Sequence, residues 1–189
     1  MSAASYSVEN YIRDLRAIVA EESDERAVVE RAKPLAQRLA AQPGWLDSGE
    51  IRYNETQGFG IRLLHQEENH DLAVFLFSWL PDRGTLPHNH KTWAVVVGID
   101  GEEQEVQYRR LDDGGTPGHA KLERTGDWTL TSGAVTTCLP EDIHSVWNTG
   151  SQVSLSLHTY GRHINFTGRS EFDPETDVER PYVVQVDEG

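Results

Sequence analysis

The sequence predicts a mainly β protein, an antiparallel sandwich or barrel preceded by two helices. In the first forty residues, apolar side chains recur at three- and four-residue spacing, which is the period of a helix. From about Gly49 onward, short apolar runs alternate with turn clusters such as Pro81-Asp82-Arg83-Gly84, which indicates many short strands. We therefore expect one domain over residues 1–189, with a helical segment at 1–45 and a β-barrel at 50–189.

Each helix is expected to show one apolar face. The first face comprises Val8, Tyr11, Ile12, Leu15, Ile18 and Val19. The second comprises Val28, Val29, Ala32, Leu35, Ala36 and Leu39. Pro34 interrupts the second pattern and is expected to kink or restart that helix, because proline lacks the backbone N–H. Both helices are expected to cover one side of a sheet.

The strands follow in order, each bounded by turn residues. They are expected at 51–53, 60–64, 72–79, 93–99, 105–109, 134–139, 146–147, 153–160 and 182–186. Glu102, Glu103 and Glu105 are interpreted as the solvated face of a hairpin, although one of these carboxylates could reach a metal. Trp79 and Trp93 are expected in the core or in a pocket wall.

The composition of the chain limits the classes of molecule that it is expected to bind. Lys and Arg number 17 against 31 Asp and Glu, a net charge of −14, which argues against binding to nucleic acid or an anionic membrane. The single cysteine, Cys138, cannot form an internal disulfide and fits a reducing compartment. Neither a signal-peptide pattern nor an apolar run of about 20 residues is found, so a cytoplasmic location is expected.

Three histidines in two places are the candidate metal ligands. His88 and His90 are two residues apart, so on a strand both imidazoles would point to one side. His144, arriving from a different strand, would complete a facial set of nitrogen ligands that leaves open positions on the metal.

This arrangement resembles that of the cupins, whose fold is a double-stranded β-helix, or jelly-roll barrel. In the common cupin pattern a glutamate follows the histidine pair by four or five residues, but here those positions are Ala94 and Val95. The resemblance therefore implies three neutral ligands. An iron(II) so held would keep its full positive charge and favour an anionic ligand such as a thiolate.

A second pattern is Ser156-Leu157-His158-Thr159-Tyr160. Its first, third and fifth residues would project to one face of a strand. Polar residues alternate in this way on any half-exposed strand, so a solvated face is one interpretation. The other is a hydrogen-bonded row that ends in a phenol beside the metal.

Taken together, these motifs resemble the thiol dioxygenases, which include cysteine dioxygenase and the bacterial mercaptopropionate dioxygenases. Residues 85–93 resemble their iron-binding strand, 142–148 the strand of the third histidine, and 169–174 their carboxy-terminal segment. The paired helices are similar too. The resemblance implies that Fe(II) binds His88, His90 and His144, and that O2 is added to a small thiol to give a sulfinate.

The resemblance also assigns further roles. Ser156, His158 and Tyr160 would be the catalytic row, with Tyr160 donating a hydrogen bond to the reacting group. The substrate would be cysteine, mercaptopropionate or mercaptosuccinate, and its carboxylate would need an arginine. Arg169 matches the bacterial position and Arg62 the animal-type one.

Other points differ from the family or stay open. Animal-type members crosslink a cysteine placed just after the histidine pair to the tyrosine, but the only cysteine here is Cys138, so no crosslink to Tyr160 is expected. Arg162 is a third candidate for the substrate carboxylate. Two alternative functions stay open. The protein could be a three-histidine oxygenase of another class, such as a diketone dioxygenase, or a cupin that binds a metal without catalysis. The oligomeric state stays open.

Overall fold

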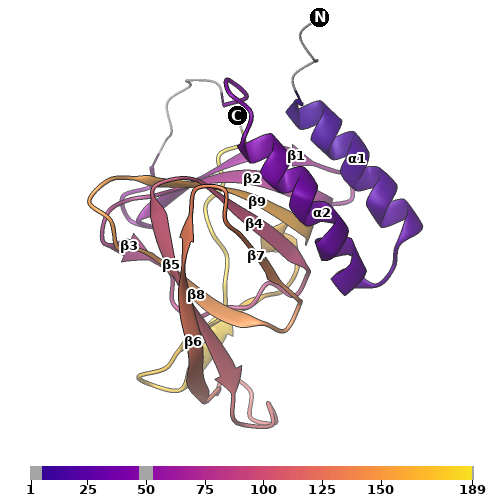
Figure 1. Cartoon of the computed structure of the whole chain (residues 1–189). Coiled ribbons are helices and arrows are strands. Elements are labelled where there is room, and N and C mark those ends of the chain that lie inside the picture. Colours follow the sequence, from indigo (N-terminus) through magenta and orange to yellow (C-terminus); the bar gives the residue numbers. More distant parts are fainter. Residues whose placement is uncertain (1–5, 47–52, 189) are drawn as a thin grey trace, which may run out of the picture.

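A computed structural model of the chain describes residues 6–46 and 53–188 (Figure 1). The helices are α1 (Val8–Glu21), α2 (Glu25–Ala40) and a short 3₁₀ helix, η1 (Ile164–Phe166). The strands are β1 (Phe59–Gln66), β2 (Asp71–Trp79), β3 (Arg83–Gly84), β4 (Ala94–Asp100), β5 (Glu102–Arg110), β6 (Leu122–Thr131), β7 (Val135–Cys138), β8 (Ile143–Asn148), β9 (Ser154–Arg162), β10 (Ser170–Asp173) and β11 (Val178–Pro181).

Two antiparallel sheets form the body of the protein, and Figure 1 shows them facing each other as the walls of a barrel. One has the strand order β1-β2-β9-β4-β7 and the other the order β3-β8-β5-β6. Strands distant in sequence are therefore neighbours, as in a jelly roll. The predicted fold class, a mainly β double-stranded β-helix barrel with two N-terminal helices, is confirmed.

The helices pack on the outer face of the five-stranded sheet (Figure 1). Alternate residues of β2, β4 and β9, such as Val74, Val95 and Leu157, are buried against them. The hydroxyls of Tyr11 in α1 and Thr159 in β9 lie 2.7 Å apart, also buried. The central strands are thus covered on both faces, which explains why residues 72–79 form a continuous apolar run.

The expected restart of the helix at Pro34 is wrong. Proline lies inside α2, which continues through it from Glu25 to Ala40. A proline costs the helix one backbone hydrogen bond. The apolar face that α2 buries against the sheet offsets this loss, because most of the stability of a helix in a protein comes from such packing.

Other differences concern the strands. Residues 182–186 form no strand, and of the expected strand 51–53 the first two residues lie outside the described part of the chain. Strands β3, β6, β10 and β11 were not predicted from the sequence, and Arg83 and Gly84 of β3 had been placed in a turn. Most side chains of β6, the edge strand that pairs with β5 in its sheet, are exposed. The strand therefore lacks the apolar alternation that would have revealed it.

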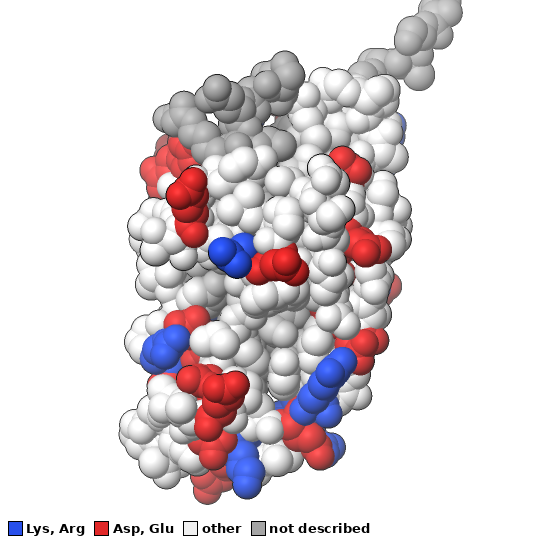
Figure 2. Space-filling model, turned by 90° about the vertical axis from the view of Figure 1, so that its left-hand side faces the viewer, with Lys and Arg blue, Asp and Glu red and all other residues white. Residues whose placement is uncertain are grey.

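Charges are spread over the surface. On the face drawn in Figure 2, the described basic side chains stand singly among acidic ones. Among residues 6–46 and 53–188, no helix is long and apolar enough to cross a membrane.

Candidate metal centre

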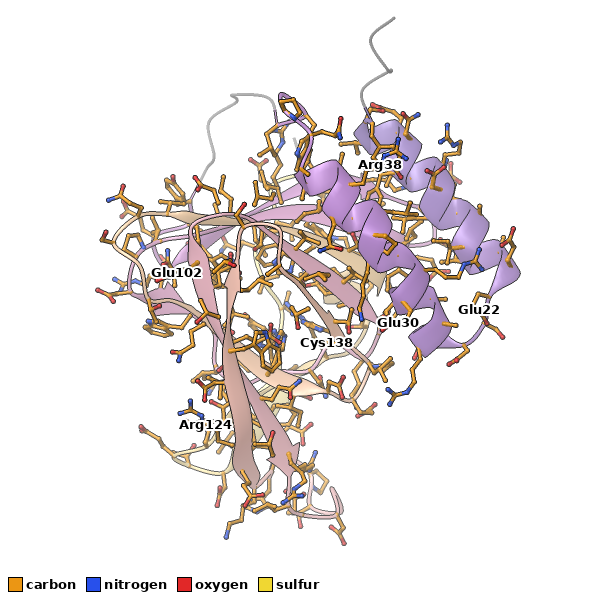
Figure 3. All side chains as sticks on the ribbon, viewed as in Figure 1. Glu22, Glu30, Arg38, Glu102, Arg124 and Cys138 are labelled. Carbon is orange, nitrogen blue, oxygen red and sulfur yellow. The ribbon has the colours of Figure 1, made fainter. Side chains whose placement is uncertain are left out.

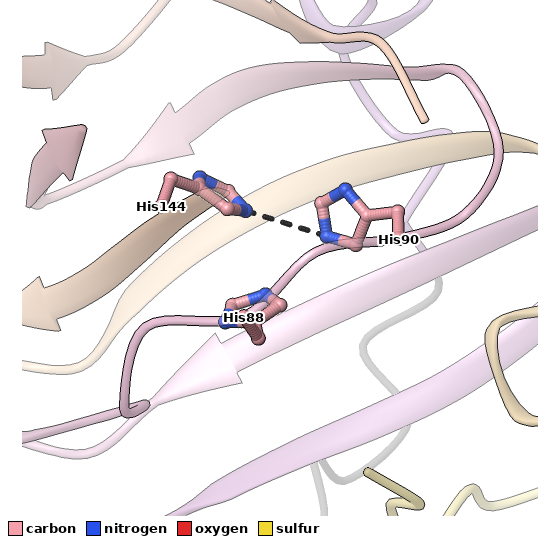
Figure 4. A group of neighbouring side chains, drawn as sticks. All are labelled: His88, His90 and His144. Atoms are coloured by element: carbon pink, nitrogen blue, oxygen red, sulfur yellow. Dashed lines mark hydrogen bonds between the residues drawn. The ribbon is translucent and has the colours of Figure 1, made fainter. Parts of the chain in front are cut away.

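The three candidate ligands meet inside the barrel (Figure 4). His144 lies on β8, whereas His88 and His90 lie on the extended segment between β3 and β4. His88 and His144 exchange two backbone hydrogen bonds, of 2.8 and 3.0 Å, which place their side chains on the same side. The expected strand at the histidine pair is thus reduced to an isolated bridge. All three side chains are buried.

Their ring nitrogens fit a metal ion. The Nε2 atoms of His90 and His144 are 3.3 Å apart. Two ligands at about 2.1 Å from one metal, with an angle of about 90–110° between them, are separated by about 3.0–3.4 Å. The Nδ1 atoms of His88 and His144 face the Leu86 carbonyl and Glu105, so in both residues Nε2 is the atom directed at the metal position.

The charge state of the two paired histidines suits ligation. Burial lowers the pKa of His88 and of His90 well below the usual range, and the neighbouring His144 lowers both further. Both imidazoles are therefore neutral, the form that binds a metal, whereas Cys138 and Glu105 raise the pKa of His144, which has to release a proton when a metal binds. The three histidines accordingly form a candidate site for a divalent metal ion.

The interpretation of Glu103 and Glu105 as solvated is wrong. Both are buried, with exposed fractions of 3% and 2%, because alternation along β5 turns them into the barrel. An oxygen of Glu105 accepts a hydrogen bond from Nδ1 of His144 at 2.9 Å. This carboxylate thus lies behind a ligand and not among the ligands, where it fixes the ring and makes Nε2 a stronger base.

Ser156, His158 and Tyr160 form a continuous row on the inner face of β9. The Ser156 hydroxyl is 2.9 Å from Nε2 of His158, and Nδ1 of His158 is 2.9 Å from the Tyr160 hydroxyl. All three residues are buried, so the solvated-face interpretation does not hold. The Tyr160 ring packs edge-on to His90, with ring centroids 5.0 Å apart. Burial raises the pKa of Tyr160, so its phenol is neutral.

Of the three candidate arginines, only Arg169 reaches the site. It is 4% exposed, and its Nε and Nη2 atoms have no hydrogen-bond partner among the described residues. Its guanidinium lies 4.1 Å above the ring of Tyr182. Arg62 is exposed on β1 and does not line the cavity, and Arg162 pairs with Asp71 near the surface at 2.8 Å.

One residue that links the segment of Arg169 to the metal ligands by hydrogen bonds was not predicted from the sequence. Asn89, between the two histidines, is buried; its N–H donates to the Ser170 carbonyl at 3.1 Å and its side-chain oxygen accepts from the Ser170 N–H at 2.9 Å. Its position between two candidate ligands is the sequence feature from which this linking role could have been predicted.

One small cavity joins these groups. Its volume is about 20 Å³. Its lining combines imidazoles, aromatic rings and one guanidinium. The lining residues are Phe59, Phe77, Trp79, Thr85, His88, His90, His144, Val146, His158, Tyr160, Arg169, Tyr182 and Val184.

Comparison with known proteins gives distant likenesses. No protein-family model matches the chain. An oxalate oxidase in complex with the substrate analogue glycolate has a TM-score of 0.46 at 16% identity, over 62% of this chain; the match spans 59% of that chain, less than two thirds of its length. An RmlC-like cupin protein from Desulfovibrio desulfuricans has a TM-score of 0.44 at 17% identity, over 61% of this chain and 92% of that one. A protein with a double-stranded β-helix domain from Klebsiella pneumoniae has a TM-score of 0.41 at 15% identity, over 68% of this chain and 89% of that one.

Glu105→Gln should weaken metal binding. Glutamine keeps the size of the side chain but replaces the charged acceptor behind His144 with a neutral one. Loss of such a partner typically costs about 10–100-fold in metal affinity. Competition with a fluorescent chelator would measure the metal affinity, with Glu102→Gln as the control on the exposed face of the same strand. Equal affinities in the two variants would contradict the role of Glu105.

Tyr160 should carry no thioether. Ala94 on β4 pairs with Cys138 on one side and with Tyr160 on the other, so two strand spacings, about 9–10 Å, separate their backbones. Figure 3 marks Cys138, whose thiol is buried, and burial raises its pKa. The intact mass should equal the sequence mass, apart from initiator methionine removal. A mass lower by two hydrogens that Cys138→Ser restores would contradict this prediction.

Proposed function

We propose that the protein is an iron(II)-dependent thiol dioxygenase that adds both atoms of O2 to the sulfur of a small carboxylated thiol. In this reaction a thiol and one O2 give one sulfinic acid, so no other reductant is consumed. One observation carries the proposal. Three histidines without a carboxylate, the His158 and Tyr160 members of the row on β9, and Arg169, whose Nε and Nη2 have no hydrogen-bond partner among the described residues, all line one cavity.

The histidines define what the metal would contribute. Iron(II) bound by these residues would supply a Lewis acid that lowers the pKa of the thiol and the redox chemistry that O2 requires. A triad without a carboxylate leaves the positive charge of the ion for an anionic substrate.

The other residues bind and orient the substrate. Nε and Nη2 of Arg169 have no hydrogen-bond partner among the described residues, so they would bind a carboxylate with paired hydrogen bonds. Tyr160, held by His158, keeps its proton at the hydroxyl facing the cavity. The rings of Phe77 and Trp79 exclude water and hold His158 in place, since Phe77 stacks on that imidazole at 3.9 Å.

The lining also bears on the choice of thiol. Among the described residues that line the cavity there is no carboxylate, so the ammonium group of cysteine has no ionic partner. A dicarboxylic thiol such as mercaptosuccinate needs a second cation, and Arg62 does not reach the cavity. Mercaptopropionate, with one carboxylate and no ammonium, therefore suits the site best.

An oxygen electrode tests the function. Iron-loaded protein would be given cysteine, mercaptopropionate, mercaptosuccinate and cysteamine in turn, and the sulfinate would be quantified. We expect one O2 consumed per sulfinate formed, fastest with mercaptopropionate. Consumption of a diketone such as acetylacetone in place of thiols would establish the other oxygenase class, although an uncharged diketone gives Arg169 nothing to bind. Absence of uptake with every compound would leave a metal-binding protein without this catalysis.

A further inference from the structure

Glu103 extends the row on β9 by one buried group. Its Oε2 lies 3.2 Å from the Ser156 hydroxyl, which in turn contacts His158. The indole N–H of Trp79 donates to the same Ser156 oxygen at 3.2 Å. A chain of hydrogen bonds thus runs from Glu103 through Ser156 and His158 to Tyr160, which lines the cavity.

The number of protons on these groups permits only two arrangements of the chain. A serine hydroxyl has one hydrogen and two lone pairs, and the Trp79 N–H occupies one lone pair. Ser156 must therefore donate to one of its two remaining neighbours, Glu103 and His158, and accept from the other. His158 is neutral, because burial lowers its pKa well below the usual range, so only one of its ring nitrogens carries a proton.

When Glu103 is ionised it can only accept, so Ser156 donates to it. Nε2 of His158 then donates to Ser156, Nδ1 has no proton, and the Tyr160 hydroxyl must donate to Nδ1. When Glu103 is protonated every bond reverses. Glu103 donates to Ser156, Ser156 donates to Nε2, Nδ1 donates to the Tyr160 oxygen, and the Tyr160 proton is free to point into the cavity.

We propose that Glu103 is a positioning residue whose proton sets the direction of the Ser156–His158–Tyr160 chain, and so decides whether the Tyr160 hydroxyl donates into the cavity. One proton leaves the chain in the change, from Glu103, and His158 exchanges one tautomer for the other. The inference rests on the proposed function only in taking the cavity to be where a thiol reacts.

The surroundings of Glu103 put this change within an ordinary pH range. Burial raises its pKa to about 8, and the charge of Glu105 on the same strand adds to the rise, whereas Ser154 and Ser156 on β9 oppose it. The Trp79 indole reaches the same hydroxyl from β2. None of these facing groups is a cation. Below pH 8 Tyr160 would donate into the cavity, and above it that proton would be withdrawn.

The tautomer of His158 is the direct readout. Protein labelled with ¹⁵N-histidine and loaded with zinc would be titrated between pH 6.5 and 9.5, and the ¹⁵N shifts of His158 would be followed without substrate. We expect Nδ1 to carry the proton at low pH and Nε2 at high pH. In Glu103→Gln the tautomer should stay constant, because an amide does not titrate. Glu102→Gln, at the exposed neighbour marked in Figure 3, should switch like the parent.

Ser156→Ala separates a relay from a through-space effect. Removing the hydroxyl cuts the chain but leaves the charge of Glu103 in place, so the switch should disappear. A His158 that keeps one tautomer in the parent, or that switches equally in Glu103→Gln, would overturn the inference.

Activity then serves as a second readout. The catalytic efficiency of the parent should fall about tenfold per pH unit above the pKa of Glu103, and this limb should be absent in Glu103→Gln. A tautomer switch without thiol oxidation would refute the proposed function but leave the relay standing. Thiol oxidation with a fixed tautomer would do the reverse.

Discussion

Replacing His90 with alanine should remove the metal and, with it, oxygen consumption. The residue supplies one of three nitrogens, and its Nε2 lies 3.3 Å from that of His144, the spacing of two ligands on one ion. Two histidines alone hold a divalent ion far more weakly, so the metal content should fall from about one ion per chain to near zero. Elemental analysis after dialysis would measure the metal, and an oxygen electrode the activity.

The fold should survive this change. Nδ1 of His90 has no hydrogen-bond partner in the part of the chain that the structure describes, so the truncation breaks no hydrogen bond of that atom. His119→Ala, at an exposed histidine away from the cavity, is the matched control and should keep its metal. A His90→Ala protein that folds and retains one ion per chain at parental affinity would refute the triad.

Arg169→Ala should strongly lower the catalytic efficiency toward every carboxylated thiol. The guanidinium is buried, and two of its nitrogens have no hydrogen-bond partner in the described part of the chain, so a carboxylate bound there would form a charge-assisted pair out of water. Truncating one partner of such a pair costs ~2–5 kcal/mol, which is tens- to thousands-fold in kcat/KM. Turnover of cysteamine, which has no carboxylate, should hardly change if it is a substrate at all.

Arg62→Ala is the matched control for this loss, because it removes the same charge from the exposed face of β1. We expect its efficiency toward monocarboxylic thiols to stay within a few-fold of the parent. If Arg169→Ala stays within a few-fold of the parent with every carboxylated thiol, Arg169 does not bind the carboxylate.

The sequence predicted most of the fold, because each helix and most strands show a period of their own. Residues 72–79 were found as an apolar run, and the two helix faces appeared as three- and four-residue spacings. What escaped were elements whose environment depends on partners far along the chain. The polar edge strand β6 has no such period, and Pro34 is tolerated because α2 packs on a sheet that begins after it.

The candidate site divides in the same way. The triad and the row on β9 could be predicted because they are local spacings of two residues. Glu103 and Glu105 could not, because the run Glu102-Glu103-Gln104-Glu105 has the composition of a solvated turn. Only the pairing of β5 with β8 brings these carboxylates inside, where Glu105 meets His144. Arg169 was preferred over Arg62 because residues 169–174 resemble a family segment, but no local pattern showed that Arg169 is buried and Arg62 exposed.

The backbone hydrogen bonds at His88 help to fix the distance between the metal position and Arg169. His88 forms backbone hydrogen bonds with His144. The next residue, Asn89, forms hydrogen bonds with Ser170, the neighbour of Arg169. These hydrogen bonds fix the backbone of the two segments relative to each other, and burial over the Tyr182 ring holds the Arg169 side chain, so together they set the span from the metal position to the guanidinium. A thiol whose sulfur and carboxylate match that span binds without rearranging the protein, whereas one methylene more or less leaves an end unpaired. The distance between sulfur and carboxylate would then be a second criterion for the substrate, besides the charges that the cavity lining can accommodate.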